Sequence, residues 1–194
     1  KCIFADNYEV IENAISERKC ITVNIPRQDS IKTLQIKPYK LLADIFTEYY
    51  YLVGYSCEQP NEEYKIATFR VSRLNNPKKC RGDYLTPSEE FALEHRLEDV
   101  SPAYLQNKAV MVKVIMTRAG EDNYFKILRN RPNAIKKETL PDKGSDYTVK
   151  YTFFGSEYQI ANYFHQFGAD AVITEPRELH NEQKKWYSKS AEAY

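Results

Sequence analysis

The sequence has few glycines, and none of them lies in a phosphate-binding pattern. Its six glycines are spread along 194 residues, without a G-x-G-x-x-G motif or a P-loop. Many nucleotide-dependent enzymes use the backbone N–H groups of such loops to cradle phosphates. The G-x-S-x-G and H-E-x-x-H patterns are missing too, and no nucleophile–base pair stands out. We therefore expect neither an enzyme nor any catalytic residue.

Metal-binding patterns and long apolar runs are also lacking. The four cysteines lie far apart without a C-x-x-C pair, and the three histidines do not cluster with them. Reduced thiols are therefore expected, with no disulfide framework, no metal and no cofactor. No apolar run approaches the ~20 residues that span a bilayer. Because no signal peptide is visible either, we predict a cytoplasmic protein without membrane contact.

An excess of charge of either sign is absent. The chain has 28 Lys and Arg residues against 27 Asp and Glu residues, which gives a formal net charge of +1. A protein that binds nucleic acid over its whole surface is usually more basic, so any such binding here must be local. Two stretches without acidic residues, 64–82 and 123–137, concentrate lysine and arginine.

The first part of the chain has the pattern of a short helix followed by short strands. Apolar residues recur at helical spacing in 7–19. Apolar and polar residues then alternate in four segments, 20–25, 31–37, 48–55 and 64–71. The last two segments are expected to pair as a hairpin. Closely spaced short strands of this kind predict a small antiparallel barrel or curled sheet, which we assign to residues 1–83.

The second part of the chain alternates strands and helices. The segment TPSE at 86–89 is a helix start with a capping box, and we assign 84–108 to a partly helical connector. Residues 109–194 follow the order β-α-β-β-α-β and end in a further helix, as in a ferredoxin-like domain. The clearest helix, 156–168, has an apolar stripe and a capping serine. The predicted fold class is therefore α+β, with two domains.

One segment suggests a binding surface rather than a core alone. EYYYLVGY at 48–55 holds four tyrosines, and Arg70 and Arg73 follow in its expected partner strand. Arginine forks bind phosphates, and aromatic rings stack on bases. Because strands alternate faces, only part of the tyrosine cluster can point one way. Spacing alone leaves open that the tyrosines are core and that the arginines pair with acids.

These residues resemble a known family. The stretch KPYKLLADIFTEYYYLVGY, followed by YKIATFRVSRL, is similar to the WYL domain of bacterial transcriptional regulators. Tyr50-Tyr51-Leu52 falls on Trp-Tyr-Leu of the family, and FRVSRL at 69–74 falls on its Phe-Arg-Leu-Asp-Arg-Ile pattern. The segment at 163–182 resembles the C-terminal extension of these regulators. Three positions depart from the family: Tyr50 replaces tryptophan, Ala67 replaces a frequent arginine and Ser72 replaces aspartate.

The resemblance implies a fold, partners and a site. It implies an Sm/SH3-like β-barrel followed by the ferredoxin-like extension, in a homodimer. It also implies an N-terminal helix-turn-helix domain, outside this chain, that binds duplex DNA. The barrel would sense a nucleotide or single-stranded nucleic acid. Carried over by position, the ligand-binding residues would be Tyr51, Arg70 and Arg73, with Lys37 and Tyr39 at the flank.

Two other functions stay open at this point. The chain could be a structural protein-interaction module that dimerises without binding a small ligand. It could also be an accessory modulator of a nucleic-acid defence system, a role that the resemblance also implies. Oligonucleotide binding together with the oligomeric state would separate these functions from ligand sensing.

Overall fold

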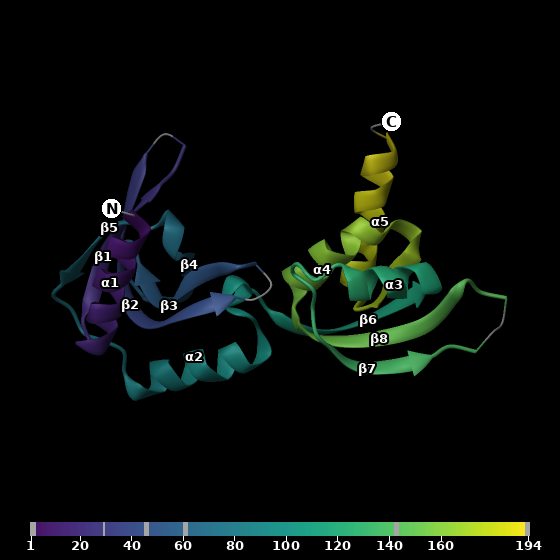
Figure 1. Ribbon diagram of the computed structural model, residues 1–194, viewed down its shortest axis with the longest axis horizontal. Coiled ribbons are helices and arrows are strands. Elements are labelled where there is room, and N and C mark those ends of the chain that lie inside the picture. Colours follow the sequence, from purple (N-terminus) through teal and green to yellow (C-terminus); the bar gives the residue numbers. More distant parts are fainter. Residues whose placement is uncertain (1–2, 29, 45–46, 60–61, 142–143, 193–194) are drawn as a thin grey trace. The chain divides into compact units, whose positions relative to one another are not determined.

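A computed structural model describes residues 3–28, 30–44, 47–59, 62–141 and 144–192 of the chain. The chain forms two compact units, Lys1–Gln106 and Asn107–Tyr194, each with its own antiparallel sheet and apolar core (Figure 1). The predicted α+β class is therefore confirmed. The residues assigned to a connector, 84–108, lie mostly in the first unit. No helix among the described residues is long and apolar enough to cross a membrane.

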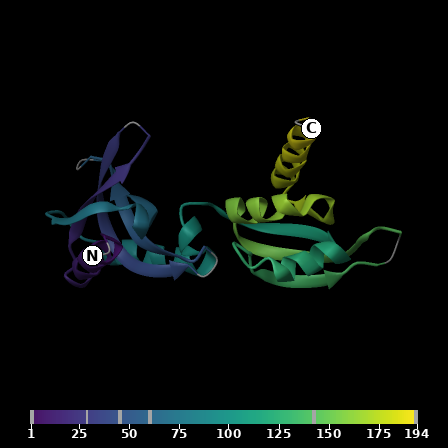
Figure 2. The ribbon, with the colours of Figure 1, turned by 45° about the horizontal axis from the view of Figure 1, so that its top comes forward.

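The first unit is a five-stranded sheet with the strand order β4-β3-β2-β1-β5. Its elements are α1 (Ile3–Ser16), β1 (Cys20–Pro26), β2 (Ile31–Asp44), β3 (Tyr49–Cys57), β4 (Lys65–Arg70), the 3₁₀ turn η1 (Val71–Arg73) and β5 (Asn75–Cys80). Each neighbouring pair is antiparallel, and β1 and β2 form a long hairpin that is clear in Figure 2. The four segments predicted as strands are all strands.

The expected Sm/SH3-like barrel is not closed. Closure needs β4 to pair with β5, but these strands form the two opposite edges of the sheet and do not pair in the described residues. Helix α1 packs against β5, β2 and η1 and covers the core beside them. Asn7 of α1 donates from its side chain to the carbonyl of Leu74, between η1 and β5 (2.7 Å). The helix thus covers the core that a strand pair would enclose in a closed barrel.

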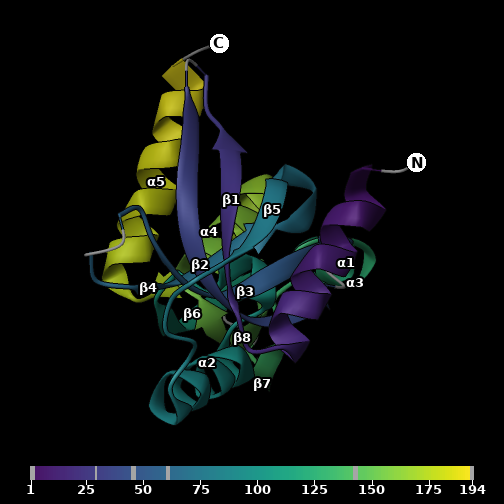
Figure 3. The same cartoon turned by 90° about the vertical axis from the view of Figure 1, so that its left-hand side faces the viewer.

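Strand β3 is packed on both faces, because two helices cover different sides of the sheet (Figure 3). Leu52 is fully buried in a core with α1, and Val53 is fully buried in a second core under α2 (Pro87–Asp99). The predicted capping box starts α2: the Glu89 N–H donates to Thr86 Oγ1 (3.2 Å), and the Thr86 N–H donates to the Glu89 carboxylate (2.7 Å). After α2, the 3₁₀ turn η2 (Pro102–Tyr104) packs on β2, β3 and β4.

The second unit has the strand–helix–strand–strand–helix–strand order predicted from the sequence. Its elements are β6 (Ala109–Thr117), α3 (Arg118–Lys126), β7 (Ala134–Thr139), β8 (Tyr147–Ser156), α4 (Glu157–Phe164), the 3₁₀ stretch η3 (His165–Asp170), β9 (Ala171–Glu175) and α5 (Arg177–Glu192). The sheet order is β7-β8-β6-β9, so the first and third strands of the unit are central. This is the arrangement of a ferredoxin-like split βαβ fold.

The core of the second unit is built on the apolar stripe that the sequence indicates, although the predicted helix 156–168 is α-helical only in α4 and continues as η3, which holds Phe167. Ile160, Tyr163, Phe164 and Phe167 are all buried and pack against the inner face of the sheet. Ser156 caps α4 by accepting from the Gln159 N–H (3.1 Å). The helical spacing of these four residues is thus explained by burial of one helix face.

Candidate functional site

The pairing of β3 with β4 brings two predicted site residues together. Tyr51 lies directly opposite Arg70 in this antiparallel pair. Directly opposite residues project from the same face of a sheet, with Cβ atoms roughly 5 Å apart. Both side chains are partly buried. Tyr51 and Arg70 therefore share one small surface at the end of the sheet.

The ring that Arg70 touches is that of Tyr49. The guanidinium carbon of Arg70 lies 3.1 Å from the centroid of the Tyr49 ring, so the cation covers the aromatic face. Tyr49 lies two residues before Tyr51 and therefore on the same face. The sequence analysis left Tyr49 out of the site. The alternation of side chains along a strand could have identified Tyr49, because it places Tyr49 and Tyr51 on the same face.

Arg70 also has an unused hydrogen-bond donor. Its Nε atom is buried and has no hydrogen-bond partner among the described residues. No carboxylate in the described part of the chain forms an ion pair with its guanidinium. Buried polar groups in native proteins nearly always find a partner, so an exception calls for an explanation such as a ligand.

Three buried hydroxyls without partners accompany Arg70. Thr68 precedes Arg70 by two residues in β4, and its Oγ1 is buried and unbonded within the described residues. The Oγ atoms of Thr47 and Ser101 are in the same state. Asp44 links these segments, because its carboxylate accepts from the Thr47 N–H and the Ala103 N–H, both at 3.2 Å.

This group of polar atoms has one location in the sheet. Asp44 lies directly opposite Tyr49, the residue on which Arg70 stacks. Ala103 is in η2, which packs on the strands that carry Tyr49 and Arg70. We call the set Tyr49, Tyr51, Thr68, Arg70 and Ser101 the Arg70 site. It offers an arginine, hydroxyl groups and aromatic rings, which are groups that bind phosphates and flat rings.

The second arginine predicted for the site is close to Arg70 in the sequence, but in the described residues no contact joins it to the Arg70 site. Arg73 closes η1, and its side chain is exposed. It forms no ion pair with the described residues. Its role as a ligand contact stays a prediction.

Lys37 and Tyr39 lie apart from the Arg70 site. Lys37 is opposite Tyr55, four residues along β3 from Tyr51, which is about 13 Å at strand spacing. Its ammonium is 3.1 Å from the Glu89 carboxylate and 4.5 Å from the centroid of the Tyr64 ring. Tyr39 packs on the core under α2. The structure therefore does not bring these two residues together with Tyr51.

The ion pair of Lys37 stabilises the charged form of Glu89. Burial alone would raise the pKa of Glu89, but the hydrogen bonds from Thr86 and the ammonium of Lys37 outweigh it and lower the pKa. Lys37 is nine per cent exposed, so its charge is neutralised inside the unit. Because Glu89 already neutralises the charge of this lysine, Lys37 is not available as a free cation for a ligand.

Two of the three departures from the family pattern lie on the other face of the sheet, and the third, Ser72, lies in η1. Tyr50 is 45% exposed and packs edge-to-face against Tyr8 of α1, with centroids 5.7 Å apart. Ala67 is buried opposite Gly54 and is three residues from Arg70, an odd spacing that turns it to the opposite side. Neither position removes a group from the face that carries Arg70 and Tyr51.

Three cysteines that are distant in sequence meet in the first unit. Cys20 lies directly opposite Cys80 in β1 and β5, and Cys57 lies opposite Gln35, whose amide is 3.6 Å from the Cys80 sulfur. Burial, followed by the nearby Cys80, raises the pKa of Cys20 to about 11. The Cys20 thiol is therefore protonated and unreactive at neutral pH. Cys2 lies outside the described residues, among which no cluster of side chains is arranged to hold a metal.

The chain is similar to solved structures of other proteins. No curated protein matches the chain. A solved structure described as a CRISPR Cas-related protein is 26% identical with a TM-score of 0.65; the match covers 99% of this chain and 53% of that protein. The chain thus spans about half the length of that protein. The proteasome accessory factor B/C (PafBC) of Arthrobacter aurescens is 18% identical with a TM-score of 0.43, over 100% of this chain and 28% of its own.

The family comparison covers the sheet that carries the Arg70 site. The family model of the WYL domain matches residues 6–79, from α1 to β5. This range includes Tyr51, Arg70 and Arg73, the residues on which the resemblance was based. Residues 6–79 of this chain are therefore a WYL domain.

Proposed function

We propose that this chain is the ligand-sensing region of a bacterial transcriptional regulator and that it binds a nucleotide or single-stranded nucleic acid at the Arg70 site. The WYL domain and the similarity to a CRISPR Cas-related protein support a regulatory, ligand-sensing role in general. The observation that carries the specific proposal is the state of Arg70, which is stacked on Tyr49 and has a buried Nε without a hydrogen-bond partner among the described residues.

The chemistry of Arg70 favours an anionic ligand. A partly buried cation without a counter-charge is costly, and an anion that pairs with it recovers part of that cost. The stacking on Tyr49 fixes the plane of the guanidinium, so the fork needs little ordering when it binds. Phosphate oxygens can accept from such a fork in a bidentate manner. Thr68, two residues before Arg70 in β4, supplies a hydroxyl on the same face.

The ligand would also contain a flat ring. Tyr51 lies opposite Arg70 on the same face and is only partly buried, so part of its side chain is accessible. Base stacking on aromatic side chains is worth about 1–3 kcal/mol per base and tolerates any sequence. The exposed Arg73 would add a second phosphate contact. These groups together fit a phosphate with an attached base.

The wider role follows from this proposal. The chain is part of a cytoplasmic homodimer, and a helix-turn-helix domain of the same protein binds duplex DNA. Ligand binding at the Arg70 site changes that DNA binding. The proposed protein has no catalytic activity and needs no metal or cofactor.

A binding experiment with matched variants tests the site. Fluorescence anisotropy would measure the affinity of a labelled oligo-dT and of mono- and cyclic nucleotides for the wild type, Arg70→Gln and Arg81→Gln. Arg81 is exposed in the same unit, so both variants lose one positive charge. We expect Arg70→Gln to weaken binding at least tenfold and Arg81→Gln to change it less than about threefold. Equal weakening in both variants would show that only diffuse charge matters.

A second function is favoured by the comparison with solved structures. The similarity to a CRISPR Cas-related protein extends over nearly the whole of this chain. An accessory modulator of a nucleic-acid defence system would use the same site on single-stranded RNA. It would prefer RNA to DNA of the same sequence, because a protein distinguishes them through the 2′-hydroxyl. Dimerisation without any oligonucleotide binding would instead favour a structural interaction module.

A further inference from the structure

The second acid-free stretch of the sequence, 123–137, is not used by the proposed function. In the structure it runs from the end of α3 through a turn into β7, outside the WYL match. Its last two bases form ion pairs with acids. The first three form none with the described residues: Lys126, Arg129 and Arg131. The positive charge of the turn is therefore not neutralised within the unit.

Two large apolar side chains stand among these bases. Phe125 is 54% exposed and Leu128 is 62% exposed. Within 125–129 the Cα atoms are at most about 14 Å apart, so the rings, methyl groups and charges form one small surface. Large apolar side chains that remain exposed together mark interaction sites more often than single scattered ones. We call residues 125–131 the α3–β7 turn.

The backbone of the α3–β7 turn is held by buried side chains of α4. The Tyr163 hydroxyl donates to the carbonyl of Ile127 (2.8 Å). The Gln159 amide donates to the carbonyl of Asn130 (3.2 Å). Both donor side chains are buried in the core of the unit. The turn therefore has a defined shape before a partner arrives, which lowers the entropy lost on binding.

The combination of groups selects a flat and anionic partner. Lys126 and Arg129 are exposed cations that can pair with phosphates. The exposed ring of Phe125 can stack on a base. A base within a duplex is already stacked on both sides, so stacking on this ring requires a single strand. An acidic peptide would supply the charge without the flat rings.

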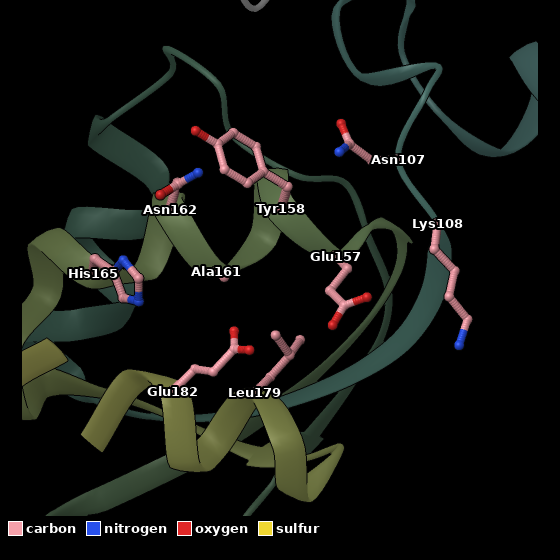
Figure 4. A pocket seen from close by; sticks show the side chains of 9 residues that line it. All are labelled: Asn107, Lys108, Glu157, Tyr158, Ala161, Asn162, His165, Leu179 and Glu182. Atoms are coloured by element: carbon pink, nitrogen blue, oxygen red, sulfur yellow. The ribbon is translucent and has the colours of Figure 1, made fainter. Parts of the chain in front are cut away.

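The cavity of the second unit does not suit the same ligand. It measures about 330 Å³ and lies between α4 and α5 (Figure 4). Its lining includes the carboxylates of Glu157 and Glu182 against one ammonium, that of Lys108. Because carboxylates repel phosphates, an anionic strand is assigned to the turn and not to the cavity.

We propose that the α3–β7 turn is a second contact for single-stranded nucleic acid, made of residues other than those of the Arg70 site. Phe125 stacks on a base, and Lys126 and Arg129 pair with the phosphates beside it. The choice of ligand rests on the proposed function. The location rests on the exposed side chains, the free charges and the fixed backbone of the turn. The complex forms without a covalent step.

Two variants of Phe125 in the full chain test the stacking. Fluorescence anisotropy with labelled oligo-dT would compare the wild type with Phe125→Leu, which stays apolar but loses the ring, and with Phe125→Tyr, which keeps it. We expect Phe125→Leu to weaken binding at least about fivefold, the lower end of what a stacked base contributes, and Phe125→Tyr to stay within about twofold of the wild type. Wild-type affinity in Phe125→Leu would overturn the proposal.

The salt dependence tests the phosphate contacts. Arg129→Gln removes one of them and should reduce the slope of log affinity against log salt concentration by about 0.7. Arg177→Gln is the matched control. Arg177 is exposed, forms no ion pair with the described residues and follows β9, which lies at the opposite edge of the sheet from β7. An equal loss of slope in both variants would show that only diffuse charge matters, which contradicts the assignment.

Cross-linking separates this proposal from the Arg70 site. An oligonucleotide with 5-iodouracil, which cross-links to stacked aromatic residues, should label the tryptic peptide 119–126, which contains Phe125, in the wild type and in Arg70→Gln alike. Labelling of the segment around Tyr51 alone would overturn the second contact and leave the Arg70 site intact. Labelling of 119–126 alone would do the reverse. Competition by poly-glutamate as strong as that by unlabelled oligo-dT would also overturn the proposal, because it would show a surface for acidic protein.

Discussion

Arg70 covers the ring of Tyr49 at 3.1 Å while the residue directly across the sheet from it is Tyr51. Tyr49 thus fixes the guanidinium of Arg70, and Tyr51 remains accessible. The WYL domain presents a guanidinium that has a defined plane before any ligand arrives. This preorganisation lowers the entropy that ordering a long side chain would otherwise cost.

The stacked pair should be measurable as a coupling. Tyr49→Leu and Arg70→Gln are expected to destabilise the first unit by different amounts, and the double variant by less than their sum. The coupling energy should be about 0.5–2 kcal/mol, because a partly desolvated cation–π contact has this size. Urea unfolding of the four proteins measures it. A coupling energy of zero would mean that the stacking contributes nothing to stability.

Tyr49→Leu should also weaken oligonucleotide binding. Without the ring, the guanidinium of Arg70 loses its fixed plane, and binding should become about three- to tenfold weaker. Tyr50→Leu is the matched control, since Tyr50 lies on the other face against Tyr8. Anisotropy with labelled oligo-dT compares them. A stronger effect of Tyr50→Leu would place the ligand on the α1 side of the sheet.

The Lys37–Glu89 pair predicts how acid affects the first unit. The folded pKa of Glu89 is lower than its unfolded value, so its contribution to stability is present above the unfolded pKa of about 4.3 and is lost as the pH falls through the folded pKa. Glu89→Gln keeps an N3 residue that can close the capping box but cannot be charged. The free energy of unfolding of this variant should therefore fall less than that of the wild type between pH 5 and pH 3. Parallel curves would refute the assignment to Glu89.

Lys37→Met separates a structural role from a binding role. It leaves the Glu89 carboxylate partly buried without its cation, which should cost about 1–3 kcal/mol of stability. Oligonucleotide affinity should remain unchanged, because Lys37 lies about 13 Å from Tyr51 along the sheet. Denaturation and anisotropy on the same preparation test both statements. If the variant lost oligonucleotide affinity while its stability stayed unchanged, Lys37 would be a ligand-binding residue.

Gly54 should tolerate no side chain. A Cβ at this position would lie 2.2 Å from the carbonyl oxygen of Lys37 in the neighbouring strand. Gly54→Ala should therefore destabilise the first unit by more than about 2 kcal/mol, since backbone must move. Gly144→Ala is the control: a Cβ there meets nothing within 4 Å, and only its positive φ opposes the change. Chemical denaturation measures the loss in free energy of unfolding for each variant, and the loss should be larger for Gly54→Ala.

The sequence was sufficient for those elements whose signal is local. The stripe of Ile160, Tyr163 and Phe164 predicts α4 because one face of the helix is buried, and Phe167 extends it into η3. The capping box of Thr86 is likewise contained in four residues. Strand β5 was not assigned because its sequence, NNPKKC, has no apolar alternation and contains a proline. Its place as an edge strand explains both features.

The candidate sites depend on contacts between distant segments, and the sequence predicted them only in part. The hairpin pairing that places Arg70 opposite Tyr51 is regular enough to be predicted, while the ligand-binding role of both residues stays a prediction. The closed barrel was wrong because spacing does not show that α1 covers the core beside β5 and η1. The acid-free stretch 123–137 was visible in the sequence, but its fixed turn was not, because Gln159 and Tyr163 hold that turn from another helix.

The unclosed sheet leaves two strand edges, and they are not equally protected against pairing with another chain. Strand β5 carries Pro77 and two lysines, Lys78 and Lys79, which are features that discourage a further strand from adding. Strand β4 is as short as β5 and contains no proline, and its charged residues, Lys65 and Arg70, stand only at its two ends. Because β4 ends at Arg70, an extended peptide that added to this edge would reach the proposed ligand site. Resistance to aggregation in this domain therefore depends most on β4.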